Sequence, residues 1–78
     1  MKARLFASLR ELAGVSEVDV EARDVAGLLE ALSRRLGPRF DRIMMSGTVV
    51  VNGEPAASDR PIGPDDEVAL LPPVSGGR

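Results

Sequence analysis

The sequence of 78 residues contains no cysteine, histidine, tyrosine or tryptophan. Without cysteine there is no disulfide bond, no thiolate nucleophile and no cysteine-based metal site. Without histidine the chain lacks the usual general base and the commonest metal ligand. The missing tyrosine and tryptophan, together with a net charge of −2, argue against nucleic-acid binding, because two kinds of base-stacking side chain and an excess of positive charge are absent.

Long hydrophobic runs are absent as well. No uninterrupted apolar run exceeds four residues, so no segment of the sequence is long enough to span a membrane. Residues 1–3 do not read as the start of a secretory signal. We therefore expect a cytoplasmic protein that binds neither membranes nor nucleic acids.

Residues with the makings of an enzyme active site are scarce too. No pair of side chains combines a candidate catalytic acid with a base, so we expect no enzyme activity in this chain alone. The acidic run 65–67 offers metal-binding oxygens, but consecutive residues at the start of a strand point in alternating directions, which favours a solvated turn. We expect no bound metal ion and no bound cofactor.

The apolar residues, 44% of the chain, are mostly aliphatic and follow regular periods. Residues 2–7 begin with polar and apolar residues in alternation, which predicts a strand with Leu5 on one face and Phe6 on the other. Residues 16–22 alternate strictly and predict a second strand that has its valines inward and its acidic residues in water.

Two helices are predicted between and after these strands. Ser8 and Glu11 have the spacing of a capping box and predict a short helix that Gly14 ends. Asp24 is a good N-cap for a longer helix that runs to about Leu36. Apolar residues repeat along this helix at helical spacing and form one stripe. The stripe comprises Val25, Leu28, Leu29, Leu32 and Leu36.

The pair Gly37-Pro38 is expected to end the long helix, because glycine suits the C′ position and proline prevents continuation. We predict a packed loop over residues 39–47, although the apolar residues of this segment also fit a helical turn. Within the long helix, Glu30 and Arg34 have the spacing of an ion pair on the exposed side.

The last third of the chain reads as strands separated by turns. The β-branched run 48–52 predicts a strand whose three valines are core residues, and Asn52-Gly53 is a strong hairpin-turn signal. Residues 54–62 are expected to hold a short strand and a crossing loop. A turn at 63–66 then leads into the final strand, 67–71.

This order of elements predicts an α+β fold of the β-grasp type. A right-handed crossover places the main helix on one face of a mixed sheet of about five strands and leaves the other face open. The first and last strands then lie side by side in the middle. The helix-facing residues are predicted to be Leu5, Val18, Val20, Val68 and Leu70, and the open-face residues Phe6, Ala69 and Leu71.

The end of the chain has no use in a core. Pro72 and Pro73 fix φ and remove two backbone donors, so regular structure should stop there. Residues 72–77 span roughly 20 Å when extended, which is enough to reach into another protein's cavity. A frayed terminus is the common alternative for such a sequence. We predict a β-grasp domain at 1–71 and a flexible C-terminal tail at 72–78.

Three segments of the sequence resemble one known family. The segments are 5–14, with Glu-Leu-Ala-Gly at its end, the turn 51–54, and the ending 66–77, with Pro-Pro-Val-Ser-Gly-Gly. They resemble the MoaD/ThiS ubiquitin-like sulfur carriers, and within that family they are most similar to the small subunit of molybdopterin synthase. The resemblance covers nearly the whole chain.

The resemblance implies a function in molybdenum cofactor biosynthesis. In that family an E1-like adenylating enzyme of the MoeB/ThiF type uses ATP to activate the terminal glycine carboxylate, which becomes a thiocarboxylate. The tail then enters the large subunit of molybdopterin synthase, of the MoaE type, and gives its sulfur to a pterin precursor. The catalytic groups belong to these partners, which fits a chain without cysteine and histidine.

Carried onto this sequence, the resemblance makes Gly77 the residue that bears the sulfur. Partner contact is implied for Phe6, Leu71, Pro72, Pro73, Val74, Ser75 and Gly76. Two departures stand out. Members often have aromatic residues before the proline pair, where this chain has leucines. Arg78 follows the glycine pair, so we expect a protease to remove it before activation, unless it is an artificial addition.

Several alternatives remain open on the sequence. The chain could carry sulfur for another pathway, such as tRNA thiolation or thiamine or cysteine synthesis. It could be a ubiquitin-like modifier that is attached to lysines. It could also be a β-grasp interaction module whose tail is never activated.

Overall fold

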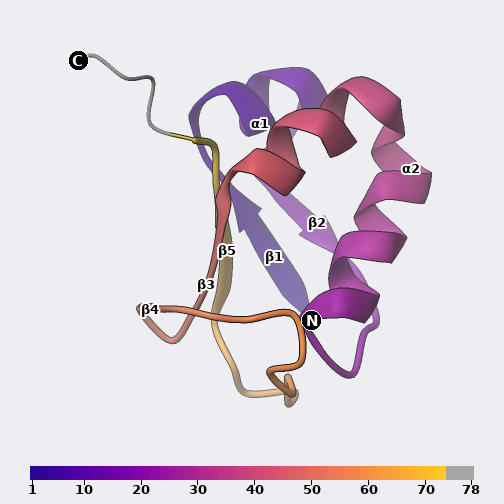
Figure 1. Ribbon diagram of the computed structural model, residues 1–78. Helices are drawn as coiled ribbons and strands as arrows, with labels where there is room; N and C mark the ends of the chain where they lie inside the picture. Colours follow the sequence, from indigo (N-terminus) through magenta and orange to yellow (C-terminus); the bar gives the residue numbers. More distant parts are fainter. Residues whose placement is uncertain (74–78) are drawn as a thin grey trace.

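In the computed structural model, residues 1–73 are described, and they form a five-stranded sheet with two helices on one side (Figure 1). The tail residues 74–78 lie outside the described residues. The elements in chain order are β1 (Lys2–Leu5), α1 (Ala7–Ala13), β2 (Glu17–Asp19), α2 (Val25–Ser46), β3 (Thr48–Val51), β4 (Glu54–Pro55) and β5 (Val68–Leu71).

The sheet has the strand order β2-β1-β5-β3-β4. Its first and last strands, β1 and β5, are parallel neighbours in the middle, and the other pairs are antiparallel. A parallel pair needs a crossover connection, which the segment containing α2 provides. The predicted β-grasp arrangement is therefore confirmed.

The core lies between the sheet and the helices. Side chains alternate along each strand, so one set points toward the helices and the other toward the open face. The five residues predicted to face the helices are all buried. Among the valines of β3, Val49 and Val51 are buried but Val50 is only half-buried, so the prediction of three core valines is wrong for Val50. The strand period of two places it on the other face.

Helix α2 begins as predicted but extends beyond its predicted end. The Asp24 carboxylate accepts a hydrogen bond from the Gly27 N–H at 2.8 Å, as an N-cap does. Gly37 then interrupts the helix with φ 90 and ψ 176, and helical structure resumes until Ser46. The predicted loop at 39–47 is wrong, because proline is tolerated in the first turn of a new helical segment. Phe40 and Met44, four residues apart, bury this segment against the core.

Helix α1 also starts earlier than predicted. Its N-cap is Phe6, which makes no side-chain capping bond, so the capping box of Ser8 and Glu11 is wrong. Ala7, with φ 49, turns the chain directly after β1, and the helix is already under way at Ser8. The predicted end at Gly14 is confirmed, with φ 78.

The loops at the start of β5 are joined by the Asp66 side chain. Its carboxylate accepts hydrogen bonds from the Gly63 N–H at 2.8 Å, Asn52 Nδ2 at 2.8 Å and Arg60 at 3.0 Å. These bonds, that of Gly63 first, lower the pKa of Asp66 below its usual value. The Asn52-Gly53 turn, with φ 53 and 83, is confirmed.

No helix within residues 1–73 is both long and apolar enough to cross a lipid bilayer.

Candidate functional site

The candidate site is the end of the central strand pair, where the chain leaves the sheet. Strands β1 and β5 are in register through Leu5 and Leu70, both buried. The next residues, Phe6 and Leu71, therefore lie at the same end of the two strands and on the opposite face. They are 38% and 37% exposed. The predicted open-face positions of Phe6 and Leu71 are confirmed; we call these two residues the Phe6–Leu71 patch.

The backbone conformation of Phe6 and a contact with Arg4 place its ring on the open face. It is extended, with φ −124 and ψ 152, so it continues the alternation of β1. The guanidinium of Arg4, two residues earlier on the same face, lies 5.9 Å from the centroid of the Phe6 ring. A cation over an aromatic ring at an exposed site contributes about 0.5–1 kcal/mol. The Arg4 contact therefore favours an orientation of the ring on the open face.

Leu71 is the last residue of β5 and marks the start of the tail. It pairs with Thr48 of β3 on one side. Pro72 follows half-buried and Pro73 exposed, and regular structure stops at Leu71, as predicted. Figure 1 shows the chain leaving β5 at the same end of the molecule as α1 and the end of α2.

The remaining predicted site residues cannot be placed. Val74, Ser75, Gly76, Gly77 and Arg78 are outside the described residues, so their roles stay predictions.

Gly47 belongs to this site, although the sequence analysis did not single it out. It joins α2 to β3 and lies against the backbone of Leu71 and Pro72. A Cβ at this position would overlap the Leu71 carbonyl oxygen. No local pattern indicates such an approach, because the two segments are far apart in the sequence.

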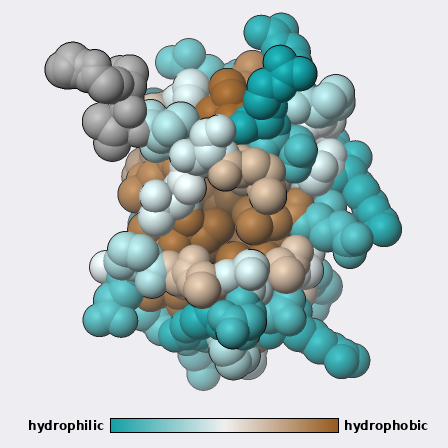
Figure 2. Space-filling view, in the orientation of Figure 1, coloured by the Kyte–Doolittle hydropathy of each residue, from teal (hydrophilic) through white to brown (hydrophobic). Residues whose placement is uncertain are grey.

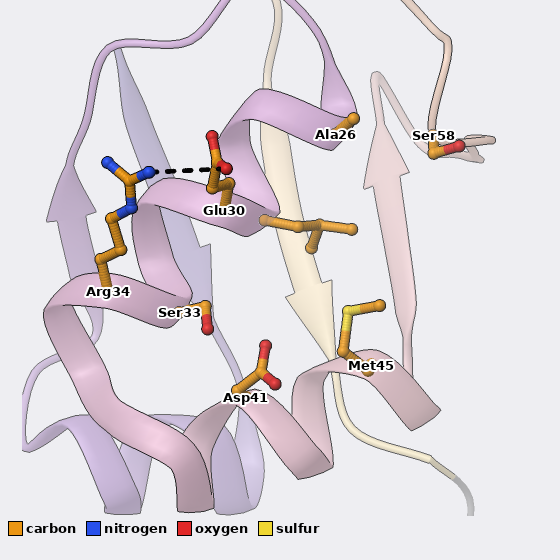
Figure 3. Close-up of a pocket in the computed structure, with 8 residues that line it drawn as sticks. Ala26, Glu30, Ser33, Arg34, Asp41, Met45 and Ser58 are labelled. Atoms are coloured by element: carbon orange, nitrogen blue, oxygen red, sulfur yellow. Dashed lines mark ion pairs between the residues drawn. The ribbon is translucent and has the colours of Figure 1, made fainter.

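A shallow groove lies on the opposite, helical side of the sheet. Figure 2 shows apolar surface gathered at the centre of this side, between α2 and β3. In Figure 3, Met45, which is 62% exposed, and Asp41 lie on one part of α2, and Glu30 and Arg34 on the other. The predicted ion pair of Glu30 and Arg34 is confirmed, with 3.6 Å between carboxylate and guanidinium.

Acidic side chains do not gather at this site in the described part of the chain. Residues 1–73 contain no group of three or more acidic side chains arranged to hold a metal ion. The carboxylate of Asp66 is occupied by hydrogen bonds within its loop. The end of the sheet near α1 instead presents the exposed apolar pair Phe6 and Leu71 next to Pro72.

Comparison with known proteins shows the family to which the chain belongs. The model of the ThiS family matches residues 3–77, from the second residue of β1 to the last residue of the glycine pair. The chain belongs to the ThiS family. The resemblance to the MoaD/ThiS carriers is therefore confirmed at the level of the family.

Proteins with known names match almost the whole chain. It is 36% identical over 81 residues to the molybdopterin synthase sulfur carrier subunit of Chlamydomonas reinhardtii, covering 99% of this chain and 98% of that one. It is 35% identical over 91 residues to small archaeal modifier protein 1 of Haloferax volcanii, covering 99% and 100%. The solution structure of small archaeal modifier protein 1 of Methanosarcina acetivorans superposes with a TM-score of 0.85 at 28% identity, covering 97% and 94%.

Proposed function

We propose that this chain is a sulfur carrier that serves as the small subunit of a molybdopterin synthase. Its Gly77 carboxylate is adenylated, converted to a thiocarboxylate and used to donate sulfur in molybdenum cofactor biosynthesis. The observation that carries the proposal is the family match, which extends through the glycine pair and ends at Gly77. The relative named as a molybdopterin synthase sulfur carrier subunit supports the choice of pathway.

The chemistry needs only a carboxylate from this chain. A carboxylate is a poor electrophile, so an E1-like adenylating enzyme of the MoeB/ThiF type would join it to AMP, with ATP as the donor and pyrophosphate as the leaving group. Hydrosulfide (HS⁻) would then attack the acyl carbon and AMP would leave, which gives the thiocarboxylate without a change of oxidation state. ATP is bound and used by the partner, and no cofactor is resident in the carrier.

The site geometry supports docking beside the tail. The Phe6–Leu71 patch would contact both the activating enzyme and a large subunit of the MoaE type. Because the patch borders Pro72, a partner that covers it also meets the base of the tail. Pro73, Val74, Ser75 and Gly76 would then line the path to the partner's catalytic centre, where residues without bulky side chains pass most easily.

Arg78 has to be removed for this function. The family match ends at Gly77, one residue before Arg78. An arginine after the glycine pair would place the free carboxylate on the wrong residue and a long charged side chain in the channel. We propose that a protease trims the chain to Gly77.

An ATP–pyrophosphate exchange assay with an E1-like enzyme tests the proposal. The chain ending at Gly77 is expected to support exchange, whereas the full chain ending at Arg78 and the Gly77→Ala variant are not. Intact mass measurement on protein from its native cell provides the second arm. If all of that protein retains Arg78, or if the trimmed chain supports no exchange, the carrier function is contradicted.

A second candidate function is protein modification, because one relative at 35% identity is named a modifier. After activation, a carrier in sulfur transfer would accumulate as the thiocarboxylate. This form is about 16 mass units heavier than the acid, because sulfur replaces oxygen. A modifier would instead appear joined to lysines of other proteins. Mass spectrometry of the native protein separates these two outcomes.

A further inference from the structure

Gly47 is the single residue between α2 and β3. Its N–H donates a hydrogen bond to the Met44 carbonyl at 3.0 Å, which closes the last turn of the helix. Its torsion angles, φ −96 and ψ −155, are extended and open to other residues. Backbone conformation therefore does not explain why a glycine stands here.

The lack of space around position 47 explains the glycine. A Cβ on Gly47 would overlap the Leu71 carbonyl oxygen and lie 3.1 Å from both the Leu71 carbonyl carbon and Pro72 Cα. All three are backbone atoms, so the clash cannot be relieved by rotating a side chain. Any residue larger than glycine forces the α2–β3 junction and the Leu71–Pro72 backbone apart.

The β5 side of this contact is anchored in the core as far as Leu70. Leu71 is paired with Thr48, and the preceding pair, Leu70 with Val49, is buried in the core. Pro72 follows with its φ fixed by the ring. A displacement at this point is therefore taken up mainly after Leu70, at the base of the tail, and it changes how Pro72 is set relative to the Phe6–Leu71 patch.

We propose that Gly47 is a positioning residue for transfer: its bare Cα sets the base of the tail relative to the Phe6–Leu71 patch. This inference rests on the proposed carrier function, in which one partner has to engage the patch and the tail at the same time. The end of α2 lies directly against the Leu71–Pro72 backbone and limits the direction in which the tail starts. A partner that docks on the patch therefore meets the base of the tail in one orientation.

The test compares Gly47→Ala with Gly53→Ala in the chain ending at Gly77. Gly53 lies at the opposite end of β3, has φ +83, and a Cβ there would meet nothing within 4 Å. Gly53→Ala therefore strains the fold without touching the tail. ATP–pyrophosphate exchange is measured with the E1-like enzyme well below both melting temperatures. Gly47→Ala is expected to lower kcat at least tenfold with a smaller change in KM, and Gly53→Ala to stay within twofold of the parent chain.

A rescue variant distinguishes positioning from general damage. One glycine inserted after Pro73 gives the tail slack, and in the Gly47→Ala background it is expected to recover at least a third of the lost rate. If Gly47→Ala does not fold, Pro72→Gly loosens the same base without a clash and is expected to lower kcat. Equal losses in Gly47→Ala and Gly53→Ala, failure of the rescue, or unchanged kcat in Pro72→Gly overturns the inference.

These outcomes are separable from failure of the proposed function. If the parent chain ending at Gly77 supports no exchange, the carrier function itself fails. If the parent chain is active and Gly47→Ala is equally active, only the role of Gly47 is contradicted.

Discussion

Asp66 holds together the loops at the end of the sheet opposite to the tail. Its three hydrogen-bond donors belong to separate parts of the chain, at Asn52, Arg60 and Gly63. Each donor favours the ionised carboxylate, and the bond from the Gly63 N–H contributes most to lowering its pKa. Protonation of this one group therefore weakens the connection between the β3–β4 turn and the start of β5.

The pH dependence of stability follows from that lowered pKa. The folded pKa lies below the unfolded one, so the stabilisation is fully present above the unfolded value of about 3.9 and is lost as pH falls through the folded value. Asp66→Asn is expected to lower the urea midpoint at pH 7 and to flatten the decline in acid. Asp65→Asn, in the neighbouring exposed residue, is the control; parallel acid profiles for Asp66→Asn and the parent chain would contradict this role.

The two phenylalanines give a matched test of the face assignment. Phe6 is 38% exposed and Phe40 is 1% exposed. Phe6→Ala is expected to reduce the free energy of unfolding by less than about 1 kcal/mol, whereas Phe40→Ala should cost about 3–5 kcal/mol. Chemical denaturation measures both.

Phe6 is expected to matter more for partner binding than for stability, because its ring is exposed. Phe6→Ala is expected to weaken binding to the activating enzyme at least tenfold in a titration. Leu12→Ala, in a residue that is 39% exposed but lies on α1, is the control and should leave binding unchanged. A loss of several kcal/mol of stability in Phe6→Ala would show that the ring is packed in the core.

Among the elements, α2 differs most from what the sequence predicts. Gly37-Pro38 normally ends a helix, and here it produces a break after which a second helical segment begins. The helical spacing of Phe40 and Met44 is visible in the sequence, but the termination signal at Gly37-Pro38 favours a loop there. Tertiary packing decides such cases, because both side chains reach the core only if the segment is helical.

The break in α2 depends on glycine at position 37. With φ 90 and ψ 176, Gly37 occupies a region that is essentially closed to L-residues, and a Cβ there would have no atom within 4 Å beyond its chain neighbours and the nearby helix backbone. Gly37→Ala is therefore expected to cost about 1–3 kcal/mol through backbone strain alone. Thermal unfolding measures the loss. D-alanine at the same position, introduced by chemical synthesis, should keep the parent stability; equal losses for both alanines would refute the strain explanation.

The strands were easier to predict than the site they build. Period-two alternation is a local signal, and it placed Leu5 and Phe6 on opposite faces correctly. The parallel pairing of β1 with β5 followed from the order of the elements. The contact of Gly47 with Leu71 could not be predicted, since it arises only when two segments distant in the sequence are brought together.

Within residues 1–73, the buried core ends before the proline pair that begins the predicted tail. The last buried residue of this part of the chain is Leu70, and the first is Ala3. A chain ending at Pro73 is therefore expected to keep the melting temperature of the full chain within about 3 °C, since a change of about 1 kcal/mol would shift it by 4–8 °C. Calorimetry measures this, and a larger drop would mean that residues 74–78 stabilise the fold.

The central position of β5 has a consequence for how the protein is made. Because the last strand lies between β1 and β3, the sheet has no partial form in which the earlier strands are fully paired. A polypeptide broken off before Val68 during synthesis would lack β5, which would leave a gap in the middle of the sheet and expose the core. Complete pairing of the sheet therefore has to wait until β5 has been synthesised, so the sheet and the Leu71 side of the Phe6–Leu71 patch form together.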